Sequence, residues 1–163
     1  MKIAAPLPIH SEAIRPEWID YNGHMNVAYY MLVFDHTVDS FMEVIGIGRD
    51  YIERSENSIF ALDTRIAYMR EVLEGQIVRC TVQLLDFDHK RLHYCFEMQH
   101  RDEGWTSAYY EAVSIHVNLN QRRSVPMPDP VLERLTQMKA AHADLAKPAS
   151  FQRSLGLDKV PVG

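Results

Sequence analysis

The densest group of polar residues in the chain is the segment 20–26, which reads Asp-Tyr-Asn-Gly-His-Met-Asn and precedes a long apolar stretch. Asn26 is a good helix N-cap, so we expect a helix to begin at Val27. The first turn of a helix presents unpaired N–H groups and a positive dipole end, which suit a developing oxyanion. Asp20 lies one short loop upstream and could bring a carboxylate to the same point. A carboxylate and an oxyanion hole that face one carbonyl are the minimum equipment for hydrolysing an activated acyl group.

The same segment also has a purely structural interpretation. Asp20, Asn22 and Asn26 are residue types that form turns before helices and cap them, and such turns are frequent. From local spacing alone the turn is the more common explanation. Both interpretations stay open at the level of these residues.

The helix that would position this loop is predicted over Val27 to Ile45, because Gly46 lies where a C-terminal glycine belongs and no proline intervenes. Its acidic residues Asp35, Asp39 and Glu43 recur every four positions and form one stripe. Nearly all other positions are apolar or aromatic. We therefore expect a helix that is enclosed on most sides.

Four later segments have the period-two alternation of half-buried strands. In the first of them, one face is predicted to carry Phe60, Leu62, Ile66 and Tyr68, and the other Ala61, Asp63, Arg65 and Ala67. The other three run near residues 78–84, 91–99 and 112–119, with short connections that predict antiparallel hairpins. Together with a strand near Ile9 to Arg15, they predict an α+β chain. Its curved antiparallel sheet of about five strands wraps around one long central helix, which is the hot-dog arrangement.

Length and composition fit one globular domain, which we place at residues 1–128, followed by a C-terminal helix and tail at 129–163. The chain has 163 residues, 47% of them hydrophobic, and a formal net charge of -5. That charge argues against a general nucleic-acid binder, and the charges within 27–45 argue against a membrane span. Residues 1–8 have no apolar run of export-signal length, so the expected location is the cytoplasm. Cys80 and Cys95 are interpreted as small buried hydrophobes, not as a disulfide pair.

The pattern Asp20-x-x-Gly23-His24-x-Asn26, followed by Tyr29 and Tyr30 on a long apolar helix, resembles the active-site loop of one enzyme family. The family comprises the hot-dog acyl-CoA thioesterases of the 4-hydroxybenzoyl-CoA thioesterase type. The resemblance covers about 120 residues and also includes the segments 66–71, 88–93 and 114–117.

The resemblance implies specific roles within the loop. Asp20 falls on the family's catalytic carboxylate, and the N–H of Val27 falls on the donor that polarises the thioester carbonyl. His24 could touch the substrate or hold the loop, and Asn26 could orient the Val27 N–H as the helix cap. Val27 stands where the family often has asparagine, so only the backbone donor carries over at this position. The resemblance further implies an acyl-CoA substrate, no cofactor, and a homodimer or homotetramer.

Other polar residues are candidates for substrate contacts. Asp63 and Arg65 lie on a strand that lines the active site across the dimer in related enzymes, although an ion pair between subunits is the plainer explanation. Cationic groups that could hold the coenzyme A phosphates are Lys90, Arg91, Arg122 and Arg123. The histidines at 89, 93 and 116 have no recognisable metal-ligand spacing, so no metal is expected in the catalysis.

Two further classes of function compete with hydrolysis. A hot-dog hydratase or dehydratase would need a histidine with an acid in another place, and a non-catalytic acyl-CoA-binding module would not need Asp20. The acyl group itself is left open by the sequence. Its walls could include aromatic residues, namely Trp18, Tyr29, Tyr30, Trp105 and Tyr110. Part of the chain is similar to thioesterases of carnitine breakdown, whose acyl group carries a quaternary ammonium.

Overall fold

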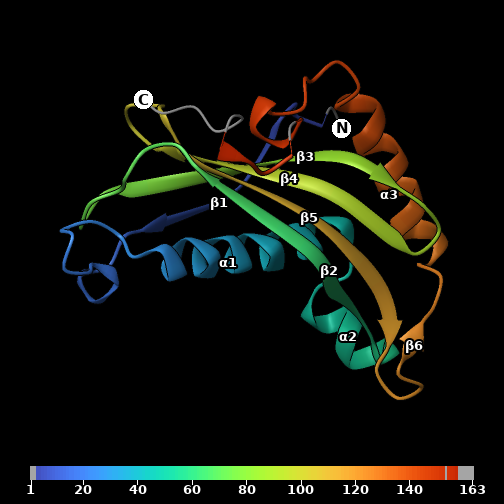
Figure 1. Cartoon of the computed structure of the whole chain (residues 1–163). Coiled ribbons are helices and arrows are strands. Elements are labelled where there is room, and N and C mark those ends of the chain that lie inside the picture. Colours follow the sequence, from blue (N-terminus) through green and yellow to red (C-terminus); the bar gives the residue numbers. More distant parts are fainter. Residues whose placement is uncertain (1–2, 153, 158–163) are drawn as a thin grey trace.

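The computed structural model describes residues 3–152 and 154–157, and its elements follow the predicted order of one strand, a long helix and four strands (Figure 1). The residues 158–163 of the predicted tail lie outside the described part. The strands are β1 (Leu7–Ala13), β2 (Asn57–Tyr68), β3 (Ile77–Phe87), β4 (Arg91–His100), β5 (Thr106–Asn118) and the short β6 (Arg123–Ser124). The helices are α1 (Val27–Ile45), α2 (Arg49–Ser55) and α3 (Asp129–Ala141), with short 3-10 turns at Pro16–Trp18 and Ala149–Phe151.

The sheet has the strand order β1-β3-β4-β5-β2, and β6 adds to β5. All strand pairs are antiparallel, as the short connections predict. The sheet curls over α1, which lies across its concave face (Figure 1). The predicted hot-dog fold is therefore confirmed. The first strand begins at Leu7, slightly earlier than the predicted stretch from Ile9 to Arg15.

The boundaries of α1 agree with the capping residues that predict them. The side-chain oxygen of Asn26 accepts a hydrogen bond from the Ala28 N–H at 2.9 Å, and Gly46 ends the helix with a left-handed φ of 89°. A side chain at Gly46 would be strained in this conformation, and it would also meet the Arg134 guanidinium.

Aromatic side chains join α1 to the sheet. Phe34 packs against Tyr110 with ring centroids 5.1 Å apart, and Phe41 packs against Tyr94 at the same separation. Phe96 lies between these pairs and contacts both phenylalanines. The predicted acidic stripe of the helix is exposed, since Asp35, Asp39 and Glu43 all face away from this core. Apolar residues of α1 are exposed as well, namely Val27, Met31 and Val44. The predicted enclosure on most sides is therefore wrong for the single chain, because the sheet covers only one face of the helix.

The predicted division of β2 into two faces is wrong in its first half. The register shifts between Ala61 and Asp63, so that Phe60 pairs with Ile115, and Asp63 pairs with Val113 on the same face. Ile66 pairs with Tyr110 on the opposite face, which is the face that contacts α1. A β-bulge adds one residue to the strand and reverses the alternation beyond it. The simple period of two therefore fails here, and Phe60 shares a face with Asp63.

The C-terminal helix α3 packs beside β3, with Val131, Leu135 and Met138 buried in the same core as α1. His142, just beyond α3, accepts a hydrogen bond from the Leu84 N–H at 3.0 Å. The segment that follows crosses the convex face of the sheet (Figure 1).

Both cysteines are buried and free, as predicted. Burial raises the pKa of each thiol to about 12, so neither is a reactive thiolate at neutral pH. Among the described residues, no helix is long and apolar enough to cross a bilayer.

Candidate active site

The carboxylate of Asp20 is held in a defined position at the mouth of α1. One oxygen accepts a hydrogen bond from the Asn22 N–H at 2.8 Å, and the other accepts one from the Asn26 side-chain amide at 2.9 Å. The backbone closes around it, because the Gly23 N–H donates to the Asp20 carbonyl and the Asp20 N–H donates to that of His24. The loop therefore combines the turn and the positioned carboxylate, the two interpretations that the residues allow.

Asn26 links Asp20 to the helix terminus. Its amide nitrogen donates to Asp20 while its amide oxygen caps the helix at Ala28. Between them, the N–H of Val27 has no acceptor within the part of the chain that the structure describes. A free first-turn N–H and a carboxylate therefore stand beside each other, joined through one side chain. This is the arrangement that a thioester carbonyl and an attacking oxygen require.

His24 is a half-buried residue of the same loop. Its Nε2 lies 3.6 Å from a carboxylate oxygen of Glu71, and its Nδ1 lies 3.4 Å from the Met25 carbonyl oxygen. The Met25 N–H in turn donates to the Val72 carbonyl at 2.9 Å. The loop is thus fastened to the connection between β2 and β3, and His24 is part of that fastening.

Hydrogen bonds lower the pKa of the Asp20 carboxyl below its ordinary value of 3.8. The largest cause is the backbone N–H of Asn22, and the Asn26 amide and the nearby His24 act in the same direction. A carboxylate that accepts two hydrogen bonds is favoured in its charged form. Asp20 is therefore ionised at neutral pH, as a base or a nucleophile must be.

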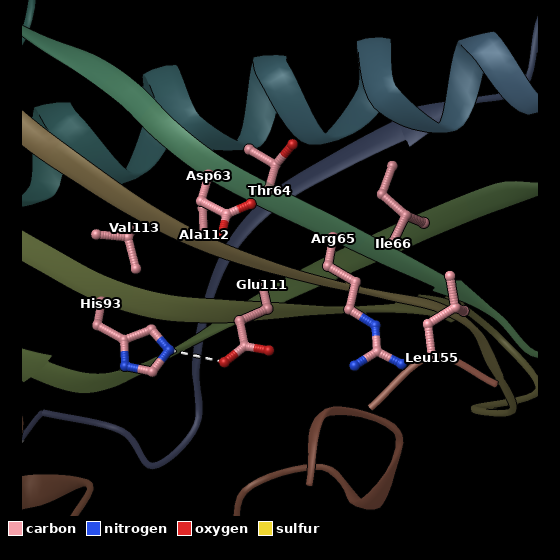
Figure 2. A pocket seen from close by; sticks show the side chains of 9 residues that line it. All are labelled: Asp63, Thr64, Arg65, Ile66, His93, Glu111, Ala112, Val113 and Leu155. Carbon is pink, nitrogen blue, oxygen red and sulfur yellow. Dashed lines mark hydrogen bonds and ion pairs between the residues drawn. The ribbon is translucent and has the colours of Figure 1, made fainter. Parts of the chain in front are cut away.

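Asp63 and Arg65 lie on the convex face of the sheet, on the other side of the strands from α1 (Figure 2). They line a cavity of about 520 Å³ together with His93 and Glu111, whose side chains contact each other at 2.7 Å. The guanidinium of Arg65 also lies 5.7 Å from the ring of Phe151. Within one chain, the structure does not bring Asp63 and Arg65 to Asp20.

Arg91 is also remote from Asp20 in the single chain. It pairs with Ile115 near the end of the sheet where His116 meets Tyr51 of α2, whereas Asp20 lies at the opposite end of α1. A helix of this length spans about 28 Å. The guanidinium of Arg91 is held by Asp88 at 2.6 Å. The backbone N–H of Lys90, followed by the Arg91 guanidinium and N–H, lowers the pKa of Asp88 to about 2. Any phosphate at Arg91 must compete with that carboxylate.

Aromatic side chains gather at the same end of α1 as Asp20. Trp18 stacks on Tyr29 with ring centroids 5.5 Å apart, and the Arg15 guanidinium lies 5.0 Å from the Trp18 ring centre. Tyr30 meets the half-exposed Tyr68 edge to face at 5.1 Å. Tyr110, in contrast, is buried in the core against Phe34. It can form a substrate wall only if the core opens.

Glu71 and the double role of Asn26 were not predicted from the sequence. The six-residue separation of Asp20 and Asn26 could have indicated their contact. An asparagine that caps a helix accepts with its side-chain oxygen, so its side-chain N–H groups can still donate to a nearby carboxylate. The contact of Glu71 with His24 had no local signal, since it joins two loops that lie far apart in the sequence.

The fold and the loop define the class of protein. Residues 14–135 match the thioesterase-like superfamily, and the chain belongs to this family. It is a thioester hydrolase. Membership of this family favours hydrolysis over the two alternatives, a non-catalytic acyl-CoA-binding module and a hydratase.

Among proteins of similar sequence is the betainyl-CoA thioesterase of Pseudomonas aeruginosa, which is 36% identical over 154 residues, 94% of this chain and 97% of that protein. The L-carnitine dehydrogenase/betainyl-CoA thioesterase of Rhizobium meliloti is 32% identical over 153 residues, which are 94% of this chain and 31% of that longer protein.

Solved structures agree with the fold. A putative thioesterase from Pseudomonas putida is 29% identical, with a TM-score of 0.80 over 94% of this chain and 98% of its own. A Staphylococcus aureus protein solved in complex with CoA has a TM-score of 0.86 at 22% identity, over 96% of this chain and 99% of its own.

Proposed function

We propose that the protein hydrolyses an acyl-CoA thioester to the free acid and coenzyme A, with Asp20 as the reacting carboxylate and the Val27 N–H as the oxyanion donor. The observation that carries this proposal is the Asn26 side chain, which binds Asp20 with one end and caps the helix beside Val27 with the other. The cap fixes the carboxylate relative to the free N–H before substrate arrives. Preorganisation of this kind is the main source of oxyanion stabilisation.

Two routes use the same groups. In the first, a carboxylate oxygen of Asp20 adds to the thioester carbonyl, the C–S bond breaks, and water then hydrolyses the mixed anhydride. In the second, Asp20 takes a proton from a water that attacks the carbonyl, and the thiolate leaves from the tetrahedral intermediate. In both routes the N–H of Val27 donates to the carbonyl oxygen as negative charge develops there. A single turnover in oxygen-18 water tests the first route, because label enters Asp20 only when water attacks the Asp20 carbonyl of the mixed anhydride. Label in the released acid alone is the result of the second route, or of attack at the acyl carbonyl of the anhydride.

The direct test is thiol release from acyl-CoA substrates, followed with a thiol reagent. The substrates should span aromatic, short, branched, long and cationic acyl groups. We expect stoichiometric release of free coenzyme A from at least one of them. Absence of release from every acyl class would overturn the proposed activity.

The acyl group that we propose is betainyl, a trimethylammonium attached to an acetyl unit. The similarity to the Pseudomonas aeruginosa enzyme over nearly the full length of both chains supports this choice. The aromatic residues at the Asp20 end of α1 also support it, because the Arg15 guanidinium already lies over the ring of Trp18. Aromatic faces attract quaternary ammonium groups.

A neutral isostere gives a sharp test of this substrate. We expect kcat/KM for betainyl-CoA to exceed that for 3,3-dimethylbutanoyl-CoA by about tenfold or more, because the two acyl groups share a shape and differ in charge. The Tyr68→Leu variant, which removes a half-exposed ring near the site, is expected to reduce this ratio. Equal values for the two substrates would refute ammonium recognition and leave thioester hydrolysis untouched.

We further propose that two chains pair through β2. This strand is the last in the sheet order, so its outer edge has no partner strand among the described residues. Residues 60–64 are all exposed, and the exposed fractions of Phe60 and Leu62 are 53% and 58%. A long apolar edge of this kind is a site for pairing with another strand. Such a pairing would also place a second chain close to the open Asp20 loop.

Sedimentation tests the dimer. We expect the wild-type protein to sediment at twice the chain mass of 18.9 kDa or a higher multiple. The Phe60→Lys/Leu62→Lys double variant is expected to shift towards the monomer, because two charges would lie at the interface. The matched control is Leu157→Lys, a fully exposed leucine outside β2. A fully active wild-type monomer would contradict this proposal.

The pH dependence should report the environment of Asp20. The lowered pKa of Asp20 means that activity persists as pH falls from neutral and is lost only below the ordinary range of an aspartate. Asn26→Asp keeps the capping oxygen but replaces the amide donor with a negative charge. We therefore expect it to raise the pKa of Asp20 and to move the acidic limb of kcat/KM to higher pH. His24→Gln serves as the control for titration of the neighbouring imidazole. An acidic limb that does not move in Asn26→Asp would argue against Asp20 as its source.

A further inference from the structure

Two histidines and a glutamate converge between β1 and α1, away from the Asp20 loop. His10 and Glu12 are two residues apart on β1 and therefore share one face of the strand. His36 projects from α1, nine residues beyond Val27, which corresponds to about 13 Å along the helix. The side chains are half-buried, with exposed fractions of 19% for His10, 13% for Glu12 and 35% for His36. None of the three has a role in the proposed hydrolysis.

The three side chains direct their ligand atoms at one point. One carboxylate oxygen of Glu12 lies 2.7 Å from His36 Nδ1 and 3.2 Å from His10 Nε2. One ligand atom from each residue can be chosen so that all three lie within 4.8 Å of one another. Ligands around a tetrahedral zinc ion, each about 2.0–2.1 Å from the metal, are separated by roughly 3.3 Å. An ion therefore fits after a small outward movement of His36.

The surroundings of the cluster hold the ligands as a metal site requires. The Ser40 hydroxyl lies 3.3 Å from Nδ1 of His10, the ring nitrogen that does not face Glu12. The same hydroxyl donates to the His36 carbonyl at 3.1 Å, so one serine is fixed beside both histidines. The second oxygen of Glu12 lies 3.5 Å from the Arg15 guanidinium. Such outer partners orient the imidazole and the carboxylate of a metal site.

We propose that His10, Glu12 and His36 bind a divalent transition-metal ion, with Zn²⁺ as the best fit, and that this ion fastens α1 to β1. Two imidazoles and one carboxylate are a ligand set that zinc uses, with water at the fourth position. The ion would have a structural role here, because the cluster is separated from Val27 by two and a half turns of α1. The competing explanation is a hydrogen-bonded clamp in which Glu12 simply joins the two histidines.

Metal binding by the untagged full-length protein distinguishes the two explanations. After treatment with a chelator, the protein is titrated with Zn²⁺ against a chromophoric chelator and with Co²⁺ for its visible ligand-field absorption. We expect one ion per chain, the intense absorption of tetrahedral Co²⁺, and a higher Tm with Zn²⁺. His10→Gln and His36→Gln should each weaken binding by about tenfold or more, and the double variant should abolish it.

The matched control is His89→Gln, which removes an exposed histidine outside the cluster and should bind Zn²⁺ as the wild type does. Circular dichroism of each variant without metal checks that the fold persists. Failure of the wild-type protein to bind one ion would overturn the proposal. Wild-type affinity in the His10→Gln/His36→Gln variant, or an equal loss in His89→Gln, would overturn it as well.

Discussion

Replacing Asp20 with asparagine is expected to lower kcat by about a hundredfold or more, because an amide can neither attack the thioester carbonyl nor accept a proton from water. The fold should tolerate the change. The asparagine oxygen can still accept the Asn22 N–H, whereas its NH₂ would face the amide donor of Asn26. The loss of one hydrogen bond of this kind costs about 1 kcal/mol of stability. Thiol release under saturating acyl-CoA measures the first effect, and thermal unfolding measures the second.

Asp50→Asn is the matched control, since it removes an exposed carboxylate in the first turn of α2, outside the Asp20 loop. It should leave kcat unchanged. The Asp20→Asn enzyme should retain a residual rate above the uncatalysed reaction, because the Val27 N–H remains. Near-normal turnover in Asp20→Asn would mean that Asp20 forms the turn and takes no part in catalysis.

The sequence was most informative about α1, because residues next to its two ends determine where the helix begins and where it ends. The cap at Asn26 and the left-handed glycine at Gly46 act on the backbone within one turn, so they predicted both ends of α1 correctly. The acidic stripe at Asp35, Asp39 and Glu43 likewise predicted the exposed side of the helix. Helix capping and the 3.6-residue period of a helix are local properties, and distant parts of the chain do not alter them.

The prediction failed where the direction of the side chains depends on how a strand pairs with its neighbour. The bulge at Ala61 and Asp63 depends on pairing with β5, and it moved Phe60 to the convex face. Hydrophobicity also misleads on β5, where the buried side chains towards α1 include Ser114 and His116. His116 is accommodated there because Tyr51 and the Val125 carbonyl satisfy both ring nitrogens. Tyr51 lies 65 residues from His116 in the sequence and Val125 nine residues from it, so neither partner belongs to the strand itself.

The candidate site was predictable only in its local part. Asp20, His24, Asn26 and Val27 form one loop and meet in one chain, as their spacing suggests. Asp63, Arg65 and Arg91 remain distant from this loop, and any contribution from them to the same site depends on a second chain. Contacts between chains are set by the shape of both surfaces, and no spacing within one sequence expresses them.

A proline at position 27 removes the proposed oxyanion donor, the Val27 N–H, while leaving the fold intact. Val27 is the first residue of α1, where proline is favoured because the N–H has no partner within the helix. The preceding residue, Asn26, has a φ of -61° and a ψ of 144°, which is the extended conformation that a following proline requires. The Val27 side chain is 58% exposed, so little packing is lost. The cap on Ala28 also remains, because that N–H is untouched.

We therefore expect Val27→Pro to keep the wild-type helix content and a similar Tm while its kcat falls by about a hundredfold to a thousandfold, the usual effect of removing one oxyanion donor. Val27→Ala is the matched control, since it removes the side chain and keeps the N–H, and its kcat should stay close to that of the wild type. Circular dichroism and thiol release measure the two properties separately.

If Val27→Pro folds and turns over normally, the backbone at position 27 does not polarise the thioester, and the donor must be sought elsewhere. If Val27→Pro and Val27→Ala lose activity equally, the side chain acts instead of the backbone. Only loss in the proline variant alone assigns the oxyanion hole to the N–H at the start of α1.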